Sequence, residues 1–296
     1  KKESSHQKAL KEELEWVRQN AKGRQAKSKA RLAKFDELSS QEFQKRNETQ
    51  DLYIPPGERL GNNVIKINDL VKSFDEKLLI DGLNMNVSPG SIVGIIGANG
   101  AGKSTLFKML TKHETPDKGS IEIGETVNLA CVDQSRDALD DNKTVWEEIA
   151  DGLDIITVGK FTIPSRQYVG RFNFKGADQQ KYISQLSGGE RNRVHLAKLL
   201  RSGGNVILLD EPTNDLDVET LRALEEAILA FPGCIMVISH DRWFLNRVAT
   251  HMLAFEGESE VVWFEGNYDA YIEDKKRRLG DKYDSITKIK YKRISV

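Results

Sequence analysis

The sequence of 296 residues lacks any apolar run that approaches the roughly 18 consecutive residues needed to cross a bilayer. It contains only two cysteines, Cys131 and Cys234, which are far apart and each lie in an apolar run. This pair fits neither a disulfide framework nor the spacing of a zinc site, so we expect two buried thiols in a reducing cytoplasm. The absences argue against a membrane-spanning protein and against a small disulfide-stabilised one.

The charge of the chain is unevenly distributed. A composition of 39% hydrophobic and 30% charged residues suits a globular protein with a charged appendage. Residues 1–35 hold eleven Lys or Arg against four Glu, a net charge of +7, so the total of −1 leaves −8 for the remainder. A basic arm on an acidic body indicates a nucleic-acid partner or a solvated helix face, and charge alone leaves both open.

The first segment, to about residue 50, is polar and almost free of helix breakers. The exception is Asn20–Gly23, which can form the tip between two helices because Asn and Gly tolerate the left-handed conformation of a helix end. Leu10, Leu14 and Val17 before the tip have helical spacing, and apolar residues after it can form a facing stripe. We expect an antiparallel helical hairpin with a basic tip.

Pro55-Pro56-Gly57 ends the helical pattern and marks a linker. Beyond it short strands alternate with helices, which implies a largely parallel sheet with helices on its faces. We expect strands at Val64–Leu70, Leu78–Val87, Ser91–Gly97, Ile121–Ile123, Val127–Val132, Val206–Asp210 and Cys234–Ser239, and helices from about Gly189 and at Val218–Ala230.

The segment GANGAGKS matches the phosphate-binding loop G-x-x-x-x-G-K-[ST], with a buried strand before it and an amphipathic helix after it. Glycines let backbone N–H groups point at phosphate oxygens, and the helix N-terminus adds its positive dipole end. We expect Lys103 to reach the β- and γ-phosphates and Ser104 to ligate Mg²⁺. The predicted nucleotide-binding residues of this loop are Gly97, Ala98, Asn99, Gly100, Ala101, Gly102, Lys103, Ser104 and Thr105.

A second motif, Val206–Pro212 (VILLDEP), is an apolar run that ends in two carboxylates. A buried strand ending at Asp210 places this carboxylate beside the phosphate-binding loop, where it can hold the metal ion. Glu211 would then lie against the attacking water as the general base. The alternative, two acidic residues that cap the next helix, leaves the apolar run unexplained.

A third motif, LSGGE, places a serine and two glycines at the start of a helix and so creates a second anion-binding helix end. One phosphate site has no use for a second phosphate clamp in the same chain. With these three motifs in order, the chain resembles the ATP-binding cassette family, in which two cassettes sandwich ATP head to tail. The resemblance implies that four signature residues contact the nucleotide of an opposing cassette: Ser187, Gly188, Gly189 and Glu190.

Further motifs of the family follow in order over residues 64–265. By resemblance Gln134 senses Mg²⁺ and the attacking water, His240 contacts the γ-phosphate, and Asn214–Asp217 pass between paired cassettes. Phe74 resembles the aromatic residue on which adenine stacks. The resemblance implies an ATP hydrolase that uses ATP and Mg²⁺ and needs a paired cassette for full activity. It assigns catalysis to Glu211, His240 and Gln134, and the metal to Ser104, Gln134 and Asp210.

Three segments, Glu13–Leu32, Leu209–Asp217 and Ile238–His251, are similar to the ABC-F members of this family. In that family an arm joins two cassettes of one chain and reaches the peptidyl-tRNA site of the ribosome. The resemblance implies that this chain is part of the arm plus the second cassette, which pairs with a first cassette or with a copy of itself. It places these arm residues near tRNA or rRNA: Trp16, Arg18, Lys22, Arg24, Lys27 and Lys29.

The predicted fold is α/β, a cassette with a mixed, largely parallel sheet, an antiparallel β layer and a helical insertion at about 137–186. The predicted domains are the arm (1–54), a linker (55–63), the cassette (64–270) and a basic tail (271–296). We expect a cytoplasmic, ribosome-associated ATPase with no membrane partner. A transporter's ATPase subunit is the main alternative; a DNA-maintenance ATPase would show coiled-coil insertions or zinc-binding cysteines. The affected step of translation, and any control by cellular energy, stay open.

Overall fold

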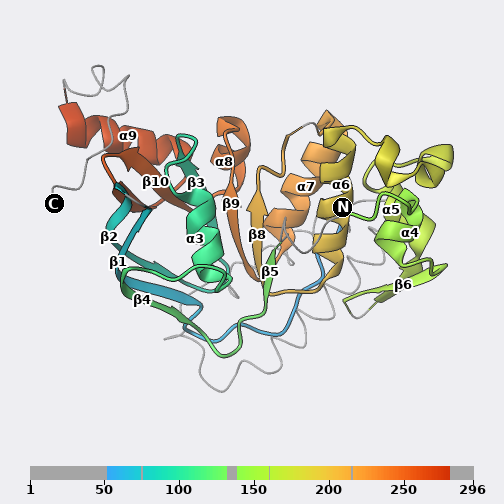
Figure 1. The fold of residues 1–296 in the computed structure, drawn as a ribbon, viewed down its shortest axis with the longest axis horizontal. Coiled ribbons are helices and arrows are strands. Elements are labelled where there is room, and N and C mark those ends of the chain that lie inside the picture. Colours follow the sequence, from blue (N-terminus) through green and yellow to red (C-terminus); the bar gives the residue numbers. More distant parts are fainter. Residues whose placement is uncertain (1–51, 75, 132–138, 160, 215, 281–296) are drawn as a thin grey trace, which may run out of the picture. The chain divides into compact units, whose positions relative to one another are not determined.

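The computed structural model describes residues 52–74, 76–131, 139–159, 161–214 and 216–280 (Figure 1). They fall into two compact units. The first unit comprises residues 52–59 and the described parts of Ala130–Ile207 and Pro212–Gly233. The second unit comprises Leu60–Leu129 without residue 75, Leu208–Glu211 and residues 234–280. Some predicted site residues lie outside the described residues: Trp16, Arg18, Lys22, Arg24, Lys27, Lys29 and Gln134.

The second unit contains an antiparallel sheet in the strand order β2 (Lys77–Val87), β1 (Ile65–Phe74) and β4 (Lys118–Ile123). Ile65 and Ile67 are buried, and they pair with Val87 and Met85 of β2, which are buried too. In this stretch of β1 and β2 every second residue therefore faces the core, as the side-chain period of a strand requires. The predicted antiparallel layer is confirmed.

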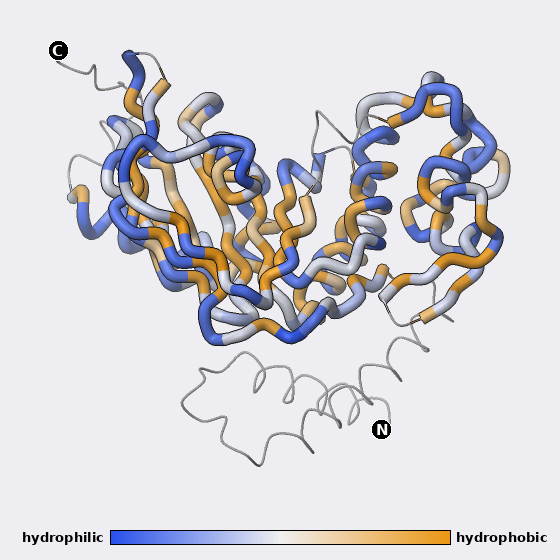
Figure 2. Tube along the Cα trace, turned by 60° about the horizontal axis from the view of Figure 1, so that its bottom comes forward, coloured by the Kyte–Doolittle hydropathy of each residue, from blue (hydrophilic) through white to orange (hydrophobic). Residues whose placement is uncertain are grey.

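The larger sheet includes, in hydrogen-bonded order, β11 (Glu260–Glu265), β10 (His251–Gly257), β3 (Ile92–Gly97), β9 (Cys234–Ile238) and β8 (Val206–Asp210). β10 and β9 run parallel to β3, whereas β11 is antiparallel to β10. The parallel strands are almost continuously apolar and buried, because both faces of such a sheet are covered (Figure 2). The predicted mixed, largely parallel sheet is confirmed.

The helices of the second unit are α3 (Lys103–Leu110), α8 (Arg242–Val248) and α9 (Tyr268–Leu279). Asp241 caps α8 by accepting a hydrogen bond from the backbone N–H of Phe244, and Asn267 caps α9 in the same way. We did not predict α8, α9, β10 or β11 from the sequence. α9 shows no apolar stripe in the sequence, because its last turn is basic and Tyr271 is its one buried residue.

The first unit holds the described part of the predicted helical insertion, and this part is not wholly helical. It contains α4 (Val145–Ala150), α5 (Ser165–Gly170) and two 3₁₀ turns, η2 (Gly176–Gln180) and η3 (Ile183–Gln185), but also the hairpin of β6 (Ile155–Val158) and β7 (Phe161–Pro164). Ile156, Val158 and Ile163 are buried alternately with exposed residues, which is the pattern of paired strands. The prediction of a helical insertion is wrong for β6 and β7.

The remaining elements of the described residues are α6 (Gly188–Arg201), α7 (Val218–Ala230) and β5 (Leu129–Cys131). α7 and β8 have the predicted bounds, because a carboxylate cap starts the helix and an apolar run makes the strand. Asp217 caps α7 by accepting hydrogen bonds from the N–H groups of Glu219 and Thr220. In the part of the chain that the structure describes, no helix has the length and apolar content to cross a membrane.

We predict that Gly119 of β4 is essential to the antiparallel sheet. Its φ is +82°, and a Cβ there would lie 2.3 Å from the carbonyl oxygen of Asp69 and 2.5 Å from that of Asn68. Gly119→Ala should lower the free energy of unfolding by about 3 kcal/mol, because the backbone of β1 must move.

Gly82→Ala is the matched control, since φ is +72° and nothing lies within 4 Å of the added Cβ. It should cost about 1 kcal/mol, from backbone conformation alone. Urea unfolding followed by circular dichroism compares the two variants, and equal losses would contradict the steric argument.

Candidate nucleotide site

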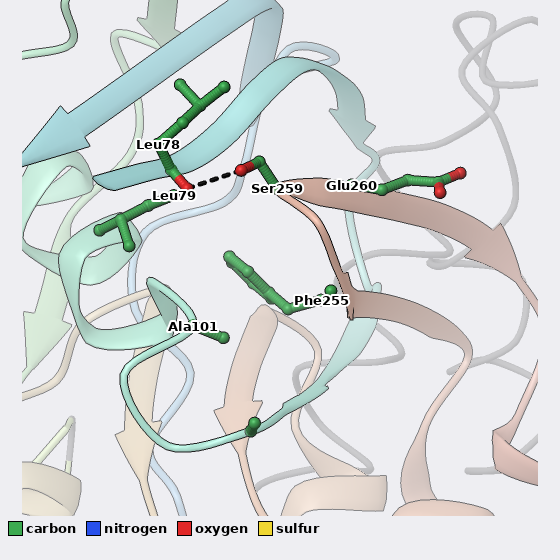
Figure 3. Close-up of a pocket in the computed structure, with 8 residues that line it drawn as sticks. Leu78, Leu79, Ala101, Phe255, Ser259 and Glu260 are labelled. Atoms are coloured by element: carbon green, nitrogen blue, oxygen red, sulfur yellow. Dashed lines mark hydrogen bonds between the residues drawn. The ribbon is translucent and has the colours of Figure 1, made fainter. Parts of the chain in front are cut away.

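The phosphate-binding loop follows β3 in the second unit, and its conformation requires glycine. Gly97 has φ +150°, and a Cβ there would lie 2.6 Å from the Cβ of Phe255 and 3.0 Å from its carbonyl oxygen. Phe255 of β10 lines one pocket together with Ala101 of the loop and Leu79 of β2 (Figure 3). Any side chain at residue 97 would therefore push the loop away from β10.

α3 begins directly after the loop with Gly102 as its N-cap, at φ +115°. No side chain caps this helix, and its first turn contains no acidic residue. The first N–H groups of a helix have no partner within the helix, and the helix dipole favours an anion there. The loop and the start of α3 therefore fit a phosphate group.

Lys103 is almost completely buried at the centre of the loop. Its Nζ donates hydrogen bonds to the carbonyl oxygens of Gly97 (2.7 Å) and Ala98 (2.9 Å). Burial lowers the pKa of the Lys103 ammonium, and the charges of Glu211 and Asp210 oppose this shift. The ammonium thus lies in the same pocket as both carboxylates, where a negative phosphate would stabilise its charge.

Asp210 is the last residue of β8 and follows four buried apolar residues. The Ser104 hydroxyl donates to its Oδ2 at 3.5 Å. Asp210 stays accessible at the strand end, yet the surrounding protein raises the pKa of its carboxyl by desolvation, against the hydrogen bond from Ser104 and the charge of Lys103. Two of the three predicted metal ligands, Ser104 and Asp210, are therefore brought together.

Glu211 is held in a left-handed backbone conformation, with φ +48°. Its N–H donates to the carbonyl oxygen of Ile238, 2.9 Å away at the end of β9. Its carboxylate lies against His240: Oε1 is 3.4 Å from Nε2, and Oε2 accepts from the His240 N–H at 3.3 Å. A non-glycine residue at positive φ is uncommon, and such strain concentrates at functional sites.

These groups share one cavity of about 330 Å³. It lies at the carboxyl ends of β3, β8 and β9, where ligands bind in open α/β sheets. Leu79 and Ile238 also line the cavity, although we did not predict them, because only the packing of the two sheets brings them to the loop. The predicted residues that line it are Asn99, Gly100, Gly102, Lys103, Ser104, Thr105, Asp210, Glu211 and His240.

The oxygen ligands fit Mg²⁺, which commonly takes one or two protein ligands and completes its octahedron with water and phosphate oxygens. Ser104 and Asp210 supply two such ligands beside the phosphate loop. No group of three or more His, Cys, Asp or Glu residues suited to a metal ion occurs within the described ranges. The donor set thus suits a metal that arrives with a nucleotide better than a permanent protein-bound one.

Phe74, the predicted adenine-stacking residue, lies at the end of β1 and is 43% exposed. It does not line the cavity. The Lys72 ammonium lies 4.8 Å from the centre of its ring and is itself bound to Glu114 (3.0 Å) and Asp117 (3.3 Å). The ring is therefore supported from one side by a buried cation, and its stacking role stays a prediction.

The signature segment lies in the first unit and begins α6. Ser187 is the N-cap, and its hydroxyl accepts from the N–H of Glu190 at 3.3 Å. In return the Glu190 carboxylate accepts from the Ser187 N–H and hydroxyl, both at 2.9 Å, which lowers the pKa of Glu190. This capping box fixes the start of the helix. Contacts of the signature with an opposing nucleotide stay a prediction.

Comparison with known proteins shows what the chain is similar to. A family model described as ABC transporter matches residues 80–214. Over 293 residues the chain is 66% identical to the energy-dependent translational throttle protein EttA of Haemophilus influenzae and 61% identical to EttA of Escherichia coli K12, each alignment covering 99% of this chain. Over nearly its whole length the chain is similar to these ABC-F members of the ATP-binding cassette family.

The chain spans about half the length of these relatives, because both alignments cover 53% of the relative. EttA of Mycobacterium tuberculosis is 55% identical over 285 residues, which is 95% of this chain and 51% of that protein. The recognition of an ABC-F protein from its motifs is confirmed.

Solved structures agree on the fold. cbiO1 of Clostridium perfringens, part of the ABC transporter complex cbiONQ, gives a TM-score of 0.53 at 21% identity and covers 76% of this chain and 98% of its own. A bacterial Atm1-family ABC exporter with ATP bound gives a TM-score of 0.58 at 22% identity, and the alignment covers 78% of this chain and 45% of the exporter chain. At these identities the likeness shows the cassette fold alone.

We predict that the capping box at Ser187 stabilises α6. Ser187→Ala removes the acceptor for the Glu190 N–H and should lower the free energy of unfolding by about 1 kcal/mol. Ser184→Ala, at an exposed serine three residues earlier, is the control and should change it little. Urea unfolding followed by circular dichroism provides the measurement. An unchanged midpoint for Ser187→Ala would show that the box contributes nothing to the fold.

Proposed function

We propose that this chain is the ATP-hydrolysing second cassette, with part of the arm, of a cytoplasmic ABC-F protein that acts on the ribosome. The observation that carries the ATPase is the convergence of Lys103, Asp210, Glu211 and His240 on one cavity of suitable volume. The relatives that support the translational role are named as translational throttle proteins and share 55–66% of aligned residues with this chain.

The phosphate loop binds the triphosphate. Backbone N–H groups of the loop and of the first turn of α3 donate to phosphate oxygens, and Lys103 moves from its carbonyl partners to the β- and γ-phosphates. Ser104 and Asp210 hold Mg²⁺, which neutralises charge on the β- and γ-phosphates when it is bound. Gln134, outside the described residues, is the third predicted metal contact.

Glu211 is the general base. Water attacks the γ-phosphorus while the bond from that phosphorus to the β,γ-bridging oxygen breaks, and the water proton passes to the Glu211 carboxylate. His240 contacts the γ-phosphate through the imidazole that now lies against Glu211. The left-handed backbone at Glu211 aims its carboxylate along the end of β9, because the residue's own N–H is bound to Ile238.

Full activity requires a second cassette, because the signature residues Ser187, Gly188, Gly189 and Glu190 are proposed to complete the nucleotide site of an opposing cassette. ATP closes the pair and locks the arm against tRNA or rRNA, and hydrolysis releases it. The domain limits at 54, 63 and 270 are part of this proposal.

A transporter's ATPase subunit is the second candidate. cbiO1 and the Atm1-family exporter share the cassette fold with this chain at 21–22% identity. At this identity their transport roles do not carry over to it. The far higher identity to translational throttle proteins favours the ribosome.

Glu211→Gln should preserve ATP binding and lower hydrolysis at least about 100-fold, because the amide cannot take the water proton. Glu226→Gln, the same substitution at an exposed position of α7, is the control and should keep the original rate. Phosphate release and ATP affinity are measured on the full-length natural protein. Unchanged turnover would remove Glu211 from the proposed role.

Co-sedimentation with ribosomes tests the translational role. The Glu211→Gln protein should pellet with ribosomes in ATP and not in ADP, because the closed pair is trapped. Replacing Arg18, Lys22, Arg24 and Lys27 by Gln should weaken this association about tenfold or more at physiological salt, since each lost phosphate contact weakens binding.

The matched control replaces four exposed basic residues of the described chain: Lys66, Lys118, Lys175 and Arg222. The net charge changes equally, so an equal loss would show a non-specific charge effect. No association in either nucleotide would leave the ATPase standing and remove the ribosome from the proposal.

A further inference from the structure

The loop between α5 and η2 carries an exposed residue between two buried aromatic ones. Phe172 and Phe174 are buried, whereas Asn173 is exposed and has a left-handed backbone conformation, with φ +61°. Asparagine adopts this conformation more readily than most residues that carry a side chain. The two anchored rings and the left-handed backbone therefore turn the Asn173 side chain away from the core of the insertion.

The Asn173 side chain reaches Asp217, which belongs to the same compact unit. Its Nδ2 donates a hydrogen bond to Oδ2 of Asp217 at 3.1 Å. The same carboxylate starts α7 by accepting from the N–H groups of Glu219 and Thr220 and from the Thr220 hydroxyl. Desolvation raises the pKa of Asp217, but these hydrogen bonds outweigh it and lower that pKa. The bond from Asn173 thus ends on a charged acceptor, which makes it roughly twice as strong as a neutral one.

The loop that carries this asparagine is fixed to α6, the helix that begins at the signature. Tyr168 of α5 is buried, and its hydroxyl donates to the Ala197 carbonyl oxygen of α6 at 2.7 Å. Its ring packs edge-on against Phe172, with 5.2 Å between the ring centroids. The buried Gln179 amide donates to the Phe174 carbonyl oxygen at 2.9 Å. Because a closely packed interior does not readily rearrange, these contacts hold the loop in a fixed place relative to α6.

Asp217 ends the segment Asn214–Asp217, which follows Glu211 along the chain and by resemblance passes between paired cassettes. The hydrogen bond from Asn173 therefore connects this segment to the insertion that holds the signature helix. In the proposed function both the segment and the signature meet the opposing cassette. Their relative position must then be kept as the pair closes, and a directed hydrogen bond at Asp217 keeps it.

We propose that Asn173 is a positioning residue for hydrolysis: it holds the Asp217 carboxylate and so keeps the segment Asn214–Asp217 aligned with the signature when two cassettes close on ATP. This inference rests on the proposed function, and it adds a residue outside every motif recognised in the sequence. Two simpler explanations compete with it. In the first, asparagine serves only the positive φ of the backbone. In the second, its hydrogen bond only strengthens the start of α7.

Asn173→Gly separates these explanations, because glycine accepts a positive φ and has no side chain that could bind Asp217. In the full-length natural protein it should lower kcat for ATP about tenfold, the equivalent of one charge-assisted hydrogen bond. The affinity for Mg·ADP, measured by isothermal titration, should stay at the parent value, because the phosphate loop is unchanged. Lys112→Gly makes the same change at an exposed residue with φ +62°, and this matched control should keep the parent kcat.

An exchange of donor and acceptor tests the hydrogen bond itself. Asn173→Asp puts two carboxylates against each other and should lower kcat further than Asn173→Gly does. Adding Asp217→Asn restores a pair of amide and carboxylate with the roles reversed, and asparagine caps a helix about as well as aspartate. The double variant should therefore recover most of the parent kcat, a non-additive result that a direct contact produces.

A parent-like kcat for Asn173→Gly would overturn the proposal. In that case a lower midpoint of urea unfolding would favour the tie at α7, and an unchanged midpoint would favour the backbone explanation. Equal losses of kcat and of Mg·ADP affinity, or a double variant no faster than Asn173→Asp, would also overturn it. Circular dichroism confirms that each variant is folded at the assay temperature. The parent tests the proposed function separately, since turnover that survives Glu211→Gln would contradict that function whatever the variants at residue 173 do.

Discussion

The burial of the Lys103 ammonium is the constraint on which the site depends. A charged group in the interior is stable only with compensating partners, and here these are two loop carbonyls and two nearby carboxylates. The loop must curl around the lysine to offer those carbonyls, which requires glycine at residue 97 and the close support of Phe255. The carboxylates must reach the same point, which requires β8 to end at Asp210.

Apolar strands deliver polar groups to one edge of the sheet, and this explains how a mostly hydrophobic core produces a polar site. β3, β8 and β9 are nearly uniform apolar runs, and each is followed by a residue that lines the cavity or enters the loop. Because strand ends are fixed by the packing of the whole sheet, their terminal side chains need little further support. Glu211 and His240 reach each other in this way from two strands.

The sequence was informative where a local pattern carries the chemistry. The phosphate loop, β8 and α7 were predicted closely, because glycine spacing, an apolar run before two carboxylates and an aspartate cap are local signals. β6, β7 and the elements after His240 were missed or misread, because their patterns are short and their burial depends on partners that are distant in the sequence. Tyr271 of α9, for example, is buried and donates a hydrogen bond to Glu256 of β10.

The left-handed backbone at Glu211 has a consequence for the evolution of the protein. A non-glycine residue at φ +48° costs on the order of 1–2 kcal/mol, and glycine would relieve most of that strain. Selection for thermal tolerance alone would therefore favour loss of the carboxylate. Under the proposed role of Glu211 as general base, the strain is retained for the reaction, and glycine at residue 211 would mark a cassette that keeps the fold without the chemistry.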